Sequence, residues 1–132
     1  MFEAIDVSGT GMHVHQTWLN AISDNVANIN TVNPYSQSAF QARYVVAQAL
    51  EDGGTGAGVA VAGIKLSSAQ GRITYDPSNP NANAQGYVRL PDIDLGEQMS
   101  DMIMAQRGFQ ANSSNIDRIK ESYQSAIQMG KS

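Results

Sequence analysis

The chain has 132 residues, a formal net charge of −4 at pH 7 and no cysteine, which leaves room for one modest domain and excludes a large multi-domain enzyme. Its 8 Lys and Arg are outnumbered by 12 Asp and Glu, so no nucleic acid is expected as a partner. Cysteine-bound zinc and thiolate catalysis are excluded, and no apolar run is long enough for direct membrane insertion.

The first predicted element is a helix from about residue 4 to about residue 30. Apolar side chains recur there with heptad spacing, which places them along one stripe of a helix together with Ser8 and His15. This seam comprises Ile5, Met12, Leu19, Ile22, Val26 and Ile29. The helix is expected to end before Pro34, with Asn28 and Asn30 satisfying carbonyl groups at its end.

The segment that follows is rich in glycine, proline and β-branched residues, which predicts short strands. Alternating apolar residues place these strands near residues 59–66, 73–75 and 87–88. The alternation slips by one residue at Gly63, which predicts a bulge. Residues 51–58 are predicted to be a flexible loop between strands, and residues 76–86 a loop without helix or central strand.

The last predicted element is a helix that begins after Asp94 and ends at Gly130. Asp94 is a suitable N-cap, Glu97 follows three residues later as in a capping box, and Gly130 is a typical stop. A second heptad seam comprises Met102, Phe109, Ile116, Ile119 and Tyr123. At 1.5 Å per residue each helix is about 40 to 55 Å long. Apolar residues beside the seams are expected to need cover from neighbouring chains, namely Val14, Trp18, Ile103 and Ile127.

These patterns predict an α+β fold, mainly α, with long N- and C-terminal helices packed as an antiparallel coiled-coil pair and a small β-rich insertion between them. The expected divisions are residues 1–34 for the N-terminal helix and turn, residues 35–93 for the insertion, and residues 94–132 for the C-terminal helix.

Three motifs occur in order along the chain. Residues 27–31 read Ala-Asn-Ile-Asn-Thr. The loop and its exit read Asp-Pro-x-x-Pro-x-Ala-x-x-x-Gly-Tyr-Val-x-x-Pro over residues 76–91, and residues 105–112 read Ala-x-Arg-x-Phe-Gln-Ala-Asn. In this order and at this chain length, the motifs resemble the proximal-rod proteins of the bacterial flagellar axial family. The motif residues taken as candidate functional positions are Asn28, Asn30, Thr31, Asp76, Pro77, Pro80, Gly86 and Tyr87.

The resemblance implies a structural subunit of the flagellar proximal rod, which polymerises through its terminal helices with copies of itself and with other rod proteins and transmits torque. The seam residues would form the assembly interface. The resemblance also implies a place in the periplasmic rod of the basal body, contact with its membrane-ring and export-gate side, and type III export without a cleavable signal peptide.

Chemical functions have weak support in the sequence. His13 and His15 are two residues apart, so on a helix they point in different directions and are better interpreted as a surface and a seam residue than as metal ligands. Asp92 and Asp94 fit a helix start better than a catalytic pair. We expect no catalytic residue, cofactor or metal. The alternative function is a soluble helical binding module or export chaperone, which would form a stable dimer and no filament.

Overall fold

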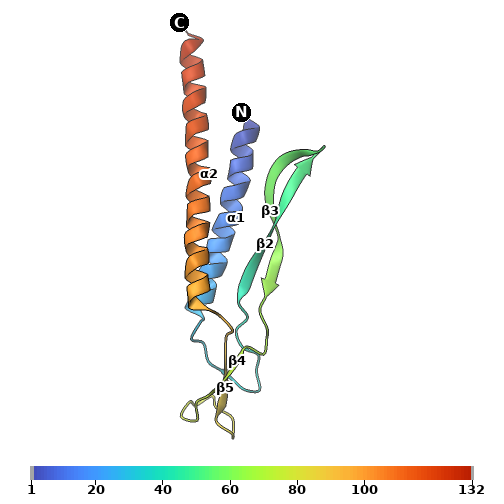
Figure 1. Ribbon diagram of the computed structural model, residues 1–132, viewed down its shortest axis with the longest axis vertical. Helices are drawn as coiled ribbons and strands as arrows, with labels where there is room; N and C mark the ends of the chain where they lie inside the picture. Colours follow the sequence, from blue (N-terminus) through green and yellow to red (C-terminus); the bar gives the residue numbers. More distant parts are fainter. Residues whose placement is uncertain (1, 132) are drawn as a thin grey trace.

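A computed structural model describes residues 2–131 as two long helices, a long hairpin and a small sheet (Figure 1). In chain order the elements are α1 (Phe2–Ala27), β1 (Asn33–Pro34), β2 (Arg43–Asp52), β3 (Thr55–Leu66), β4 (Arg72–Tyr75), β5 (Tyr87–Leu90) and α2 (Leu95–Met129). The predicted α+β class, with terminal helices and a β-rich segment between them, is confirmed. The coiled-coil geometry of the pair stays a prediction.

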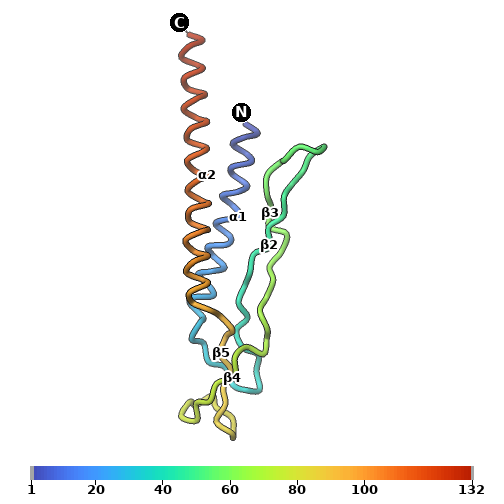
Figure 2. The backbone as a smooth tube through the Cα atoms, in the orientation of Figure 1, coloured from blue at the N-terminus to red at the C-terminus, as the bar shows by residue number. Residues whose placement is uncertain are grey.

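Helix α1 is the central element of the molecule. It packs against α2 on one side and against the hairpin of β2 and β3 on another. The two helices run in opposite directions, and α2 continues past the N-terminal end of α1 (Figure 2). Their register is marked by Asn115 Nδ2, which donates a hydrogen bond of 2.8 Å to Ser8 Oγ, and by the Phe2 and Tyr123 rings, whose centroids are 6.1 Å apart.

The ends of both helices follow local sequence signals. Helix α1 ends at Ala27, earlier than predicted, because the N–H of Ile29 turns back to the carbonyl of Val26 in a tighter turn. Helix α2 begins after Asp94, whose Oδ1 accepts a hydrogen bond of 2.8 Å from the Glu97 N–H, and ends before Gly130, so both predicted ends of α2 are confirmed. Neither helix in residues 2–131 is long and apolar enough to cross a membrane.

Strands β2 and β3 form an antiparallel hairpin that the sequence analysis predicted only in part. Val46 pairs with Gly63 and Ala47 with Val61, so Ala62 is unpaired and the bulge predicted near Gly63 is confirmed. The predicted loop over residues 51–58 is wrong, because both strands continue into it and only Gly53 and Gly54 form the turn. Their φ angles of 58° and 87° are those of a tight two-residue hairpin turn. Strand β2 itself was missed.

The small antiparallel sheet has the strand order β1-β5-β4 and lies at the end of the molecule opposite the C-terminus (Figure 1). Val88 in its central strand is 1% exposed. Arg89 fastens the flanking loops to this strand, since its Nε donates to the Tyr35 carbonyl and its Nη1 to the Gln70 carbonyl, each at 2.8 Å. The sheet therefore forms a compact base from which the helices and the hairpin extend.

Candidate functional site

The side of α1 that faces α2 carries small and polar residues. A Cβ added at Gly11 would lie 2.9 Å from the Asn112 side chain, and one added at Gly108 would overlap the His15 ring. Ala105 is fully buried. The two backbones therefore approach closely at positions where larger side chains would not fit.

The base of the helical pair is held by a buried polar cluster, the Asn25 node, made of Asn25, the Gln98 side chain and the Arg43 backbone. Asn25 Nδ2 donates to Gln98 Oε1 at 2.8 Å and to the Arg43 carbonyl at 3.0 Å. Asn25 Oδ1 accepts from the Arg43 N–H at 2.8 Å. Asn25 and Gln98 are 0% and 1% exposed, so loss of one partner would leave buried polar groups unsatisfied. One side chain thus joins α1, β2 and α2.

Charged groups surround this node on the surface. Arg43 Nη1 and Asp24 Oδ2 form an ion pair at 2.9 Å between half-exposed side chains, which contributes little in water. The pKa of Tyr44 is raised above its ordinary value, first because burial disfavours the phenolate and then because nearby carboxylates repel its charge. These carboxylates belong to Glu97, Asp92 and Asp101.

The apolar residues predicted to form the assembly interface are mostly half-buried within the single chain. Two members differ, since Ile22 is buried at 2% exposed and Tyr123 is 44% exposed. The half-buried members are Ile5, Met12, Leu19, Val26 and Ile29 on or just after α1, and Met102, Phe109, Ile116 and Ile119 on α2. Polar pairs such as Ser8 and Asn115 contribute to the contact between the helices, and most apolar seam residues keep surface that the chain does not cover.

Other apolar residues on α2 are more exposed. Leu95, Met99 and Ile103 follow one another at intervals of four residues and are 46%, 56% and 50% exposed, which places them on one face of the helix. The expectation that Val14 needs a neighbouring chain is wrong. Val14 is buried because the hairpin covers it, and Val59 of β3 lines the same apolar groove.

The motif residues at the end of α1 shape the turn that follows it. Asn28 Nδ2 donates to the Asp24 carbonyl at 2.9 Å, and Asn28 Oδ1 accepts from Thr31 Oγ1 at 3.2 Å. Asn30 is exposed. This turn directs the chain toward β1.

The motif residues of the 76–86 loop lie beside the small sheet. The Asp76 N–H donates to the Gly86 carbonyl at 2.8 Å and closes the neck of the loop. Gly86 has φ +84°, and a Cβ there would lie 2.8 Å from the Tyr75 ring, so the position requires glycine. The Tyr75 and Tyr87 rings meet edge to face with centroids 5.4 Å apart. Pro77 lies against Gly86, and Pro80 is exposed on the loop.

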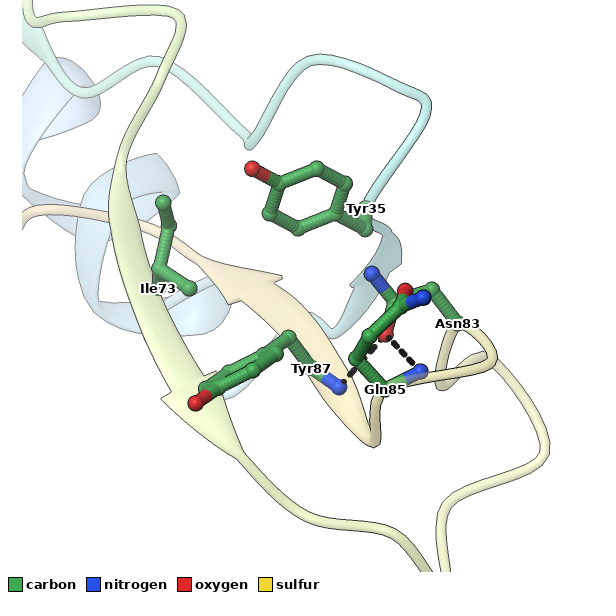
Figure 3. A pocket seen from close by; sticks show the side chains of 5 residues that line it. All are labelled: Tyr35, Ile73, Asn83, Gln85 and Tyr87. Carbon is green, nitrogen blue, oxygen red and sulfur yellow. Dashed lines mark hydrogen bonds between the residues drawn. The ribbon is translucent and has the colours of Figure 1, made fainter.

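A hollow of about 360 Å³ lies at this end of the molecule, lined by Tyr35, Ile73, Asn83, Gln85 and Tyr87 (Figure 3). We call it the tyrosine hollow. Asn83 Oδ1 accepts from the N–H groups of Gln85 and Tyr87 at 3.0 and 2.9 Å, which fixes the orientation of the amide. The Arg89 guanidinium lies over the Tyr35 ring, 4.7 Å from its centroid. The lining contains aromatic, aliphatic and amide groups and no carboxylate.

The residues considered for chemical functions lie apart or serve the fold. His15 Nδ1 lies 2.7 Å from the Gly11 carbonyl, and His13 is exposed. Asp94 acts as the N-cap of α2. In the part of the chain from residue 2 to residue 131, no three His, Asp or Glu side chains gather where they could hold a metal ion.

Sequence reasoning missed Asn25, Gln98, Gly11 and Gly108 as the residues that position the helices. The heptad pattern was defined by apolar residues alone, so it gave no weight to polar residues or glycine on the same face. The available signal was their place on the seam, since Gly11 and Asn25 lie three residues after Ser8 and Ile22, at a spacing that keeps them on the same helix face.

Two family models match the ends of the chain. The one described as "Flagella basal body rod protein" matches residues 5–34, and the one described as "Flagellar basal body rod FlgEFG protein C-terminal" matches residues 84–129. They cover most of α1 with its turn, and β5 with α2, so they include Asn25, Gln98 and the helical seam but not β2, which carries Arg43 of the node.

Several curated proteins are similar to the chain over nearly its whole length. The flagellar basal-body rod protein FlgC of Borreliella burgdorferi is 32% identical over 96% of this chain and 95% of its own. The protein of the same name from Aquifex aeolicus is 32% identical over 99% of this chain and 98% of its own. The one from Escherichia coli O157:H7 is 29% identical over 99% and 98%.

Proposed function

The chain belongs to the FlgC family of flagellar basal-body rod proteins and is a structural rod subunit rather than an enzyme, and we propose that it polymerises through the apolar surface of its terminal helices. The seam residues Leu19 and Phe109 represent this surface on α1 and α2. Contacts between unlike patches on successive copies need not close, and they then generate a helical tube.

The observation that carries the proposal is the incomplete burial of apolar residues along both helices. Leu19 and Phe109 are half-buried, whereas Met99 and Ile103 are 56% and 50% exposed. An exposed apolar stripe of this length on a helix marks a surface for another protein. At about 25 cal/mol per Å² of apolar surface removed from water, several neighbours together would form a rigid, torque-bearing contact.

The partners and location belong to the same proposal. A rod subunit assembles with other components of the basal body, and we infer that the neighbours here are copies of the chain and other proximal-rod proteins, with the membrane-ring and export-gate side at one end. We infer a periplasmic position and export without a cleavable signal peptide as further parts of this proposal, which family membership supports. The chain's weak charge, 15% charged residues, suits contacts made by apolar and amide groups.

The test is a pair of charge insertions on the seam. Leu19→Asp or Phe109→Asp, expressed in cells that lack the native protein, is expected to abolish swimming and rod assembly while the protein is still produced, because a carboxylate on an apolar interface is desolvated without a partner.

The matched controls are Asn20→Asp and Gln110→Asp, which add the same charge at exposed neighbouring positions. They are expected to swim normally. Circular dichroism of the purified variants separates lost assembly from lost folding. Normal rods built from both seam variants would overturn the proposal, and a stable dimer that never enters a rod would favour the binding-module alternative.

A further inference from the structure

We propose that the free edge of β2 pairs, antiparallel and around a two-fold axis, with the same edge of a second copy of the chain. The occupant of the edge is the segment of residues 46–50 from the other copy. This contact uses the hairpin and leaves the helical seams uncovered, so the inference goes beyond the proposed polymerisation and does not depend on it.

Helix α1 covers only part of the hairpin's edges. Strands β2 and β3 form a sheet of two strands alongside α1 (Figure 1), so each strand has one edge that no other strand covers. At the base of β2, Asn25 bonds to the N–H and the carbonyl of Arg43. Further along the hairpin, the Val59 N–H of β3 donates to Thr10 Oγ1 at 3.1 Å. The helix therefore lies at the edge of β2 near the base and at the edge of β3 beyond it.

The outer edge of β2 beyond Arg43 presents free backbone groups. Those of Arg43 point away from β3, because both are bonded to Asn25. Alternation along a strand gives the same direction to the groups of Ala47 and Ala49, and Val59, the residue opposite Ala49, also directs its N–H out of the hairpin. Within residues 2–131, no hydrogen bond joins Ala47 or Ala49 to a residue outside the hairpin. These groups form a template for another strand.

The sequence of β2 does not protect this edge. Residues 44–50 read Tyr-Val-Val-Ala-Gln-Ala-Leu, without a charge, a proline or a glycine, whereas edges that stay single usually carry lysine, proline or a bulge. The extra residues of both irregularities in the hairpin, Ala57 and Ala62, belong to β3, so β2 itself is regular. Val46 and Leu50 are 45% and 40% exposed. A regular, uncharged and exposed edge is suited to strand addition.

The edge is complementary to itself. In an antiparallel pair centred on Gln48, Val46 of each copy lies opposite Leu50 of the other, so the two exposed apolar side chains of β2 cover one another. The same alignment places the free backbone groups of Ala47 opposite those of Ala49 in the other copy. Both the backbone and the side chains thus match in a single register.

The charges of the hairpin favour the antiparallel orientation. Its tip carries the carboxylates of Glu51 and Asp52, and its base carries Arg43 and Lys65. Glu51, Asp52 and Lys65 form no ion pair within residues 2–131. Antiparallel pairing brings the negative tip of each hairpin toward the positive base of the other, whereas parallel pairing places like charges together. Because the same patch is used on both copies, the contact closes as a dimer.

The absence of native cysteine allows a direct test by cross-linking of the full chain. Gln48 lies on the two-fold axis at a position where facing Cα atoms are about 4.5 Å apart, which a disulfide can span. Oxidation of purified Gln48→Cys is expected to give a disulfide-linked dimer. The matched control Ala62→Cys, at an exposed position on β3, is expected to give about tenfold less dimer under the same conditions.

Two further variants test the pairing in the Gln48→Cys background. Ala47→Pro removes an N–H that the hairpin does not use itself, at an edge position where proline is tolerated. Val46→Lys leaves the backbone intact and places a charge opposite Leu50 of the other copy. Each is expected to lower the dimer yield about tenfold, with the far-UV circular dichroism of the monomer unchanged.

Three results would each overturn the edge pairing: equal dimer yields from Gln48→Cys and Ala62→Cys, no dimer from Gln48→Cys, or a yield that neither Ala47→Pro nor Val46→Lys lowers. The swimming test of Leu19→Asp and Phe109→Asp does not involve the edge of β2. Failure of the edge pairing and failure of the proposed polymerisation are therefore distinguishable.

Discussion

The two ends of the helical pair are held in different ways. At the base, the fully buried Asn25 joins α1 to α2 and β2 through three hydrogen bonds. At the far end, Phe2 and Tyr123 are in ring contact but are 71% and 44% exposed. The chain thus fixes its own geometry at the base, where the contacts are internal, and leaves apolar surface at the end where a neighbour would provide the remaining contacts.

Hydrogen exchange of the monomer should show this difference most strongly. Amides of α2 near Gln98 and Ala105 are expected to exchange several orders of magnitude more slowly than those after Tyr123, because the first group opens only with the buried node and the second lies beyond α1. Uniform protection along α2 would contradict the contrast between the two ends.

Disruption of the node should have the largest effect on stability. Asn25→Asp replaces the Nδ2 donor by an oxygen that faces Gln98 Oε1 and the Arg43 carbonyl, so we expect a loss of about 3 kcal/mol in the free energy of unfolding. Thermal or urea denaturation measures it. Asn20→Asp, at an exposed position on the same helix, should change stability by less than about 0.5 kcal/mol. Equal losses of stability in the two variants would show that the node does not stabilise the base of the helical pair.

Substitution of a glycine where the helices approach closely is expected to have the next largest effect on stability. Gly108→Ala places a methyl group on the His15 ring, and we expect a net loss of about 1 to 2 kcal/mol after the gain in helix propensity. The matched variant Gly9→Ala, where a Cβ meets nothing within 4 Å, should gain up to about 1 kcal/mol. Addition of His15→Ala is expected to restore part of the stability lost in the Gly108→Ala variant, because it removes the ring that the methyl group would meet. The double-mutant cycle measures this coupling.

Removal of the surface ion pair beside the node is expected to have the smallest effect on stability. Asp24→Asn removes a pair whose side chains are 52% and 54% exposed, so the loss should be less than about 0.5 kcal/mol at low salt and smaller at high salt. A loss as large as that of Asn25→Asp would show that charge rather than the buried amide holds the base together.

The β-rich segment shows what local patterns miss. The bulge near Gly63 was predictable because alternation along one strand reveals it. The extension of the hairpin to Gly53 and Gly54 was not, because glycine-rich sequence indicates flexibility unless the pairing partner is known. The tyrosine hollow also escaped prediction, since Tyr35, Ile73 and Tyr87 come from three separate segments.

Local patterns were sufficient to predict both helices, the cap at Asp94, the stop at Gly130 and the rod motifs, because heptad spacing and capping signals involve residues that are close together in the chain. Which residues face one another depends instead on contacts between distant segments. Asn25 and Gln98 are 73 residues apart in the chain, and the helices meet through polar groups and glycines because close backbone approach and buried hydrogen bonds select residues that an apolar pattern passes over.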